Sequence, residues 1–179
     1  PAGLLISPAT WQRDNDPIFF WEPPLAAPEV AGYSYGIDQA PDDAIDTTSL
    51  SFHVATGGSG PWTDGKHTFA VKAINTAGNA GAPLQIEIWV DTTPPQIVTY
   101  TPSPGTLFNT VSPAVSVTVS DGGSGVSQTS VSLFVNGGAA SIAFSEATGV
   151  MTATGGSWQE GVNSLELRVA DLVWNTQAP

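Results

Sequence analysis

An internal repeat restricts the possible folds of this chain more than any other feature of its sequence. Separate blocks match when the sequence is aligned with itself at an offset of 96 residues. The matching pairs are Ser7-Pro8 with Ser103-Pro104, Pro17 with Pro113, Trp62 with Trp158, Asp64-Gly65 with Glu160-Gly161, and Asn79 with Asn175. Several matches at one offset indicate a duplicated structural unit. The 179 residues are therefore predicted to form two copies of one small module.

Each copy is predicted to consist of β-strands. Short segments alternate between apolar and polar residues and are separated by Gly, Pro, Asn and Asp, whereas no segment has helical apolar spacing over three turns. The clearest strands are expected over residues 68–74, 84–90, 114–119, 131–135 and 165–169. Because side chains alternate between the faces of a strand, the inward positions include Phe69, Val71, Leu84, Ile88, Leu165 and Leu167.

A short proline-containing linker separates the two copies. Residues 90–95 read VDTTPP, and two adjacent prolines remove two backbone donors, so the preceding strand cannot continue. The predicted domains are residues 1–93 and 94–179. At the repeat offset, residues 175–179 align with residues 79–83, and the first copy then continues into LQIEIWVD. The second copy is therefore expected to lack its last strand and to have an open sheet edge.

The composition excludes several classes of function. The chain has no Cys, two His, four Lys or Arg and sixteen Asp or Glu, for a net charge of −12. The lack of Cys excludes disulfides, thiol catalysis and Cys-ligated metal sites. The negative charge disfavours nucleic acid and anionic membrane surfaces, whose binding needs Lys and Arg. No signal peptide or long apolar span is present, and residues 1–10 have no initiator Met, so we expect a piece of a longer protein.

Two stretches of the sequence resemble known extracellular repeats. The first copy contains PIFFWEPP, GYSYGID and DGKHTFAVKAINTAGNAG, and it resembles fibronectin type III-like modules of large bacterial and archaeal surface or secreted proteins. The second contains DGGSGVS and EGVNSLELRVAD and is similar to bacterial immunoglobulin-like repeats, except that Trp174 stands where such repeats usually have Gly. About seven short strands per copy agree with this resemblance. The expected fold is all-β, with two tandem immunoglobulin-like (fibronectin type III-like) β-sandwiches, in an extracellular or cell-surface setting.

Catalysis is not expected. A Ser or Thr nucleophile would need His53 or His67 as its base, but both lie in strand-like segments with no G-x-S-x-G motif nearby. The carboxylates lie mostly in predicted turns, without long loops to form a pocket between them. We therefore expect a non-enzyme.

Calcium is the candidate ligand. Hard cations prefer several oxygen ligands, and tandem β-sandwich modules often gather such ligands where consecutive modules meet. The first set of candidate metal ligands is Asp91 at the end of a strand, with Asn75 and Asn79 around the preceding turn. Asp121 with Asp171 in the second copy is a second and independent candidate. The alternative is that these Asp and Asn side chains only stabilise turns through their own backbone.

The predicted function is that of a non-catalytic structural or spacer module in a larger surface, adhesin or filament-forming protein. Its expected partners are neighbouring modules of the same chain, with self-assembly through the open sheet edge as a further hypothesis. The alternative function is a carbohydrate-binding accessory module of a secreted hydrolase, since the chain contains six Trp and aromatic side chains can stack on sugars.

Overall fold

The computed structural model describes residues 9–25, 29–58 and 60–177. The structure is all-β, and its described part contains one short 3-10 turn, Gln128–Ser130, but no α-helix. The chain divides into two compact units, Pro1–Thr92 and Thr93–Pro179. This division lies one residue before the predicted boundary and falls within VDTTPP. No helix in the described ranges has the length and apolar character needed to cross a membrane.

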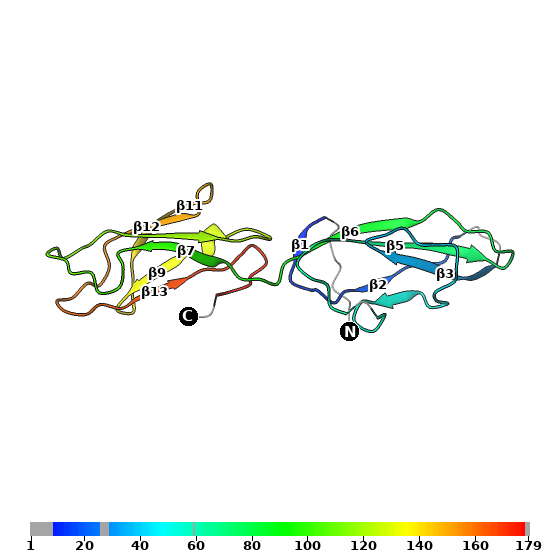
Figure 1. Cartoon of the computed structure of the whole chain (residues 1–179), viewed down its shortest axis with the longest axis horizontal. Helices are drawn as coiled ribbons and strands as arrows, with labels where there is room; N and C mark the ends of the chain where they lie inside the picture. Colours follow the sequence, from blue (N-terminus) through cyan, green and yellow to red (C-terminus); the bar gives the residue numbers. More distant parts are fainter. Residues whose placement is uncertain (1–8, 26–28, 59, 178–179) are drawn as a thin grey trace. The chain divides into compact units, whose positions relative to one another are not determined.

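The first unit contains two sheets (Figure 1). In the four-stranded sheet, β6 lies between β1 and β5, and β3 forms the far edge. Only the β1–β6 pair in this sheet is parallel. The second sheet is the antiparallel pair β2–β4. The strands are β1 (Trp11–Gln12), β2 (Ile18–Phe20), β3 (Val30–Ile37), β4 (Ser51–His53), β5 (Gly65–Asn75) and β6 (Leu84–Val90).

An aromatic core holds the two sheets of the first unit together. Phe19 of β2 stacks on Phe69 of β5, with ring centroids 4.1 Å apart and planes 7° from parallel. Phe52 of β4 adds a further ring, while Ile88 and Val90 of β6 are fully buried beside them. Each such side chain contributes roughly 1.5–3 kcal/mol when it is fully buried. Because both sheets supply buried side chains to one cluster, the unit is consistent with a β-sandwich.

The second unit is also built from two sheets (Figure 1). The strand order is β10-β9-β13 in one and β11-β12-β8-β7 in the other, with every pair antiparallel. Val119 and Met151 from the larger sheet pack with Leu133 and Val135 from the smaller one. The strands are β7 (Gln96–Thr101), β8 (Val115–Ser120), β9 (Ser132–Val135), β10 (Gly138–Ala139), β11 (Ser141–Ser145), β12 (Val150–Thr154) and β13 (Leu165–Arg168).

Two positions predicted to face inward are instead exposed. Leu84 at the start of β6 is 69% exposed, although Ile88 and Val90 on the same face are fully buried. Leu165 at the start of β13 is 43% exposed, although Val169 is buried. Alternation along a strand determines the face to which a side chain points, but burial also requires another element to cover that face. Both leucines lie at the start of their strands, where this cover is incomplete.

The 96-residue repeat is also present in the hydrogen bonds of one turn. In the first unit, the N–H of Asn75 donates to the carbonyl of Asn79 at 3.0 Å. In the second unit, the N–H of Asp171 donates to the carbonyl of Asn175 at 3.2 Å. The turn of the first unit begins at the end of β5, and the turn of the second unit follows β13. The sequence repeat therefore corresponds to the same backbone turn in both units.

Candidate metal centre

Asp121 lies immediately after β8 and organises the DGGSG loop. Its Oδ1 accepts hydrogen bonds from the backbone N–H groups of Gly123 at 3.0 Å and Gly125 at 2.7 Å. Gly125 has a φ of +93°, which glycine adopts without steric cost. The loop therefore folds around the carboxylate and fixes its position.

Asp171 lies after β13 and is fully buried. Its Oδ1 accepts from the N–H groups of Val173 at 2.9 Å and Asn175 at 2.8 Å, and its Oδ2 accepts from Nδ2 of Asn175 at 2.6 Å. The neighbouring backbone ties this turn to the Asp121 loop, because the N–H of Leu172 donates to the carbonyl of Gly125 at 2.9 Å. Hydrogen bonds from the protein thus hold both carboxylates of the second unit in place.

Asp91 follows the last residue of β6 and is 1% exposed. Its N–H donates to the carbonyl of Gln12 at 2.9 Å, which continues the pairing of β1 with β6 by one residue. This pairing fixes the backbone from which the Asp91 side chain extends.

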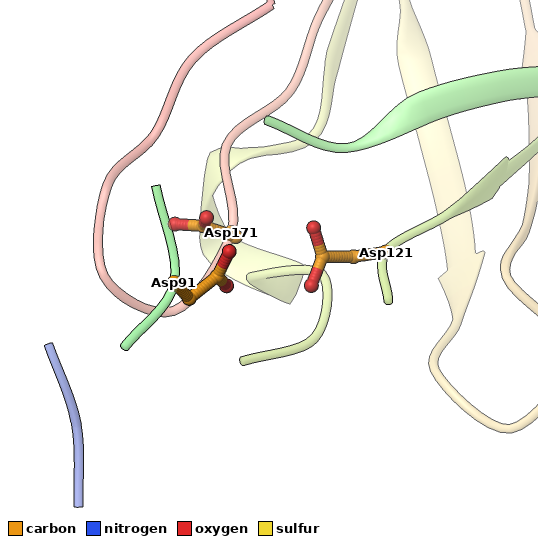
Figure 2. Close-up of side chains that lie close together, drawn as sticks. All are labelled: Asp91, Asp121 and Asp171. Carbon is orange, nitrogen blue, oxygen red and sulfur yellow. The ribbon is translucent and has the colours of Figure 1, made fainter. Parts of the chain in front are cut away.

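The carboxylates of Asp91, Asp121 and Asp171 form one cluster, which we call the Asp triad. Each offers one oxygen, and these oxygens all lie within 4.8 Å of one another. Figure 2 shows the three carboxylate groups close together. Asp91 and Asp171 are buried, and Asp121 is half-buried. Carboxylates this close repel one another when all are ionised, and the attraction of each carboxylate to a bound cation would outweigh that repulsion.

The geometry and chemistry of the Asp triad suit a hard divalent cation. Calcium binds oxygens at about 2.3–2.6 Å, so two ligands on opposite sides of the ion lie about 4.6–5.2 Å apart. The spacing within the triad lies inside that limit. All three side-chain donors are oxygens, which Ca²⁺, Mg²⁺ and Mn²⁺ prefer, whereas zinc and copper sites usually include His or Cys. The triad could therefore hold a metal ion of the oxygen-preferring class.

The structure does not bring the other two predicted ligands to Asp91. Asn75 is the last residue of β5, whereas Gly65 at the opposite end of β5 pairs with Val90. Ten residue steps along a strand span about 33 Å, so Asn75 and Asn79 lie far from the end of β6. Oδ1 of Asn75 instead accepts from the N–H groups of Ala77 and Asn79, as the turn hypothesis expected. These two residues are better explained as turn residues.

Asn175 is a residue of the site that the sequence interpretation did not include. It is 7% exposed, and its side chain donates to Asp171 as described above. The sequence signal that could have identified Asn175 was its alignment with Asn79 at the repeat offset. Asn175 orients a candidate ligand and so has the position of an outer-shell residue in a metal site.

Both histidines are engaged with carboxylates in the first unit. Nε2 of His53 lies 2.9 Å from Oδ2 of Asp16. Nδ1 of His67 lies 2.8 Å from Oδ2 of Asp38, and its Nε2 lies 2.8 Å from the carbonyl oxygen of Thr63. Both contacts of His67 are to acceptors, and its ring also stacks on Trp62 at 4.8 Å. These contacts explain His67 as a structural residue that joins a loop to β5.

Comparisons with known proteins do not assign the chain to a family. No protein-family model matches the sequence, and no curated protein is significantly similar to it.

Proposed function

We propose that this chain is a non-catalytic structural module of a larger extracellular protein, such as a surface protein, an adhesin or a filament-forming protein, and that its Asp triad binds calcium. Two small all-β units that repeat one sequence pattern support a spacing or presenting role. The expected partners are neighbouring modules of the same chain. The resemblance of both copies to repeats of surface and secreted proteins supports an extracellular setting, where calcium is abundant.

The observation that carries the metal-binding part of the proposal is the Asp triad. One oxygen from each of the three carboxylates lies within 4.8 Å of the others, and three negative charges this close are costly to maintain unless a cation compensates them. Calcium is favoured over magnesium because it accepts variable geometry and coordination number. Magnesium requires near-octahedral geometry at about 2.0–2.1 Å and usually keeps several waters.

Calcium binding would stabilise the folded chain by mass action. A ligand that binds only the folded state adds about 2.7 kcal/mol at a concentration one hundred times its dissociation constant. Extracellular calcium modules have dissociation constants of about 10⁻⁴–10⁻³ M, so stabilisation should be measurable at millimolar calcium. The backbone around Asp121 and Asp171 should gain most of the protection from exchange, since their loops are built around the ligands.

The test is calcium titration by isothermal calorimetry, together with melting curves in calcium and in chelator. Asp121→Asn is the main variant, because an amide oxygen can still accept the hydrogen bonds from Gly123 and Gly125. Asp171→Asn is the second variant, since Asn75 forms the equivalent turn in the first unit. Glu146→Gln removes one exposed negative charge from the same unit and is the charge-matched control.

We expect both Asp variants to lower calcium affinity by at least about tenfold, as loss of even an outer-shell partner often does, and the control to leave it unchanged. Equal calcium affinities for the three variants would show that calcium responds only to the net charge and would overturn the proposal. A wild-type melting curve that is the same in chelator and in about 5 mM calcium, roughly five times the weakest dissociation constant in that range, would also overturn the proposal.

The carbohydrate-binding alternative has weaker support. Trp11 and Trp89 are half-buried and meet edge to face, with ring centroids 5.5 Å apart and planes at 65°. Lys66 also lies 4.0 Å from the centroid of the Trp89 ring. A sugar platform needs an accessible ring face, so this arrangement favours a packing role for the pair.

A further inference from the structure

Strand β13 is paired along one edge only within the described part of the second unit. Leu165 to Arg168 pair with Val135 to Ser132 of β9, and no other described strand adjoins β13. The corresponding strand of the first unit, β5, has neighbours on both sides, β3 and β6. An edge with unpaired N–H and C=O groups can accept a further strand.

The chain already begins to pair with this edge. Ala170 and Thr176 form an antiparallel bridge, and the N–H of Gln177 donates to the carbonyl of Val169 at 3.4 Å. Ile74 and Ala80 form the equivalent bridge in the first unit, where the N–H of Gly81 donates to the carbonyl of Ala73 at 2.9 Å. All four of these residues lie 96 positions before their counterparts. In the first unit, the same turn leads directly into β6.

The apolar side chains of β13 are more exposed than their counterparts in β5. Phe69 is 3% exposed and Val71 is 7% exposed, with Ile86 and Leu84 as their respective partners in β6. At the offset positions, Leu165 is 43% exposed and Leu167 is half-buried. β5 has 11 residues, whereas β13 has only four. Among the residues that the structure describes, none gives the free edge of β13 the strand pairing and apolar cover that β6 gives β5 in the first unit.

We propose that the free edge of β13 accepts one antiparallel β-strand in cis, entering directly from the turn at residues 171–177. The occupant is an extended segment of about seven residues with apolar side chains at alternate positions, as in β6. A cis strand is favoured because the turn delivers it in register at a high effective concentration. A strand from a second copy would have to pair beside Thr176 and Gln177 or displace them, because these residues already pair at the beginning of this edge. The proposal does not depend on calcium binding.

The test adds the eight residues 84–91, LQIEIWVD, after Pro179. This position reproduces the first unit, because Ala178-Pro179 repeats the Ala82-Pro83 that precedes Leu84. The matched control is LQNENWND, in which asparagine replaces the three alternating apolar residues that follow Leu84 in one face of the strand. Hydrogen–deuterium exchange of residues 165–168, the melting temperature and the sedimentation mass are measured for the 179-residue chain and for both extended chains.

We expect LQIEIWVD to slow exchange over β13 by at least about tenfold, to raise the melting temperature by about 5 °C or more, and to leave the protein monomeric. The control extension should neither slow exchange over β13 nor raise the melting temperature. Equal protection by both extensions would show that the edge has no preference for an apolar strand and would overturn the proposal. Protection that occurs only when the extended protein dimerises would assign the edge to a second copy, which would also contradict a cis strand.

Discussion

Trp174 occupies in the second unit the backbone position that Gly78 occupies in the first. Both have a left-handed φ, +69° for Trp174 and +80° for Gly78. The N–H of Gly78 donates to the carbonyl of Asn75 at 2.9 Å, and the N–H of Trp174 donates to the carbonyl of Asp171 at 3.3 Å. The turn thus forms without the glycine that the resembling repeats contain. Its other hydrogen bonds, above all those to the Asp171 carboxylate, hold a bulky residue in an unfavourable conformation.

Replacing Trp174 with glycine should therefore stabilise the second unit. The left-handed conformation costs a non-glycine residue roughly 1–2 kcal/mol, and the Trp174 side chain is 61% exposed, so we expect the relief of backbone strain to exceed the burial that is lost. We expect Trp174→Gly to raise the free energy of unfolding by about 1 kcal/mol, measured by urea denaturation. The reciprocal change Gly78→Ala should lower stability by a similar amount. A destabilised Trp174→Gly protein would show that contacts of the indole outweigh the backbone strain.

Two acidic residues that follow β3 should differ in their importance for stability. Asp38 accepts hydrogen bonds from the N–H of Thr68 at 2.7 Å and from His67, so it joins two segments of the first unit. Asp43 pairs with Lys72, but its side chain is 78% exposed. The Asp38 side chain is 49% exposed, but it accepts two hydrogen bonds, and hydrogen bonds to charged groups contribute more than exposed ion pairs do. Asp38→Ala should cost about 1–2 kcal/mol in urea unfolding and Asp43→Ala less than about 0.5 kcal/mol; equal losses would contradict this account.

The sequence predicted strands more reliably than it predicted their surroundings. The predicted strand 84–90 matches β6 in its bounds, and Ile88 and Val90 are buried as alternation requires. Leu84 and Leu165 were wrongly expected inside, because cover by other segments is a tertiary property that periodicity does not contain. Residue chemistry identified all three members of the Asp triad as candidates, but it could not separate them from Asn75 and Asn79, whose distance depends on the β5–β6 register.

Two positions on one face of β6 provide a direct test of this distinction. Ile88 is fully buried against the aromatic core, and Leu84 is 69% exposed. Removing a fully buried aliphatic side chain leaves a cavity and typically costs 2–5 kcal/mol, whereas an exposed leucine contributes little. Chemical denaturation should therefore give a loss of about 2–5 kcal/mol for Ile88→Ala and less than about 1 kcal/mol for Leu84→Ala. A large loss for Leu84→Ala would mean that another segment covers this end of β6 in solution.

Asn175 should affect calcium affinity without being a ligand. Its Nδ2 donates to Oδ2 of Asp171 at 2.6 Å, which orients the carboxylate within the Asp triad. Loss of an outer-shell partner typically weakens metal binding about 10- to 100-fold, so Asn175→Ala should weaken calcium binding by a factor in that range. Asn79→Ala is the matched control, since Asn79 holds the equivalent turn position in the first unit and lies far from the triad. Isothermal calorimetry measures the affinity of both variants, and circular dichroism checks that both remain folded. If Asn79→Ala weakens calcium binding as much as Asn175→Ala does, the ion binds elsewhere and the assignment of the triad as the calcium site is wrong.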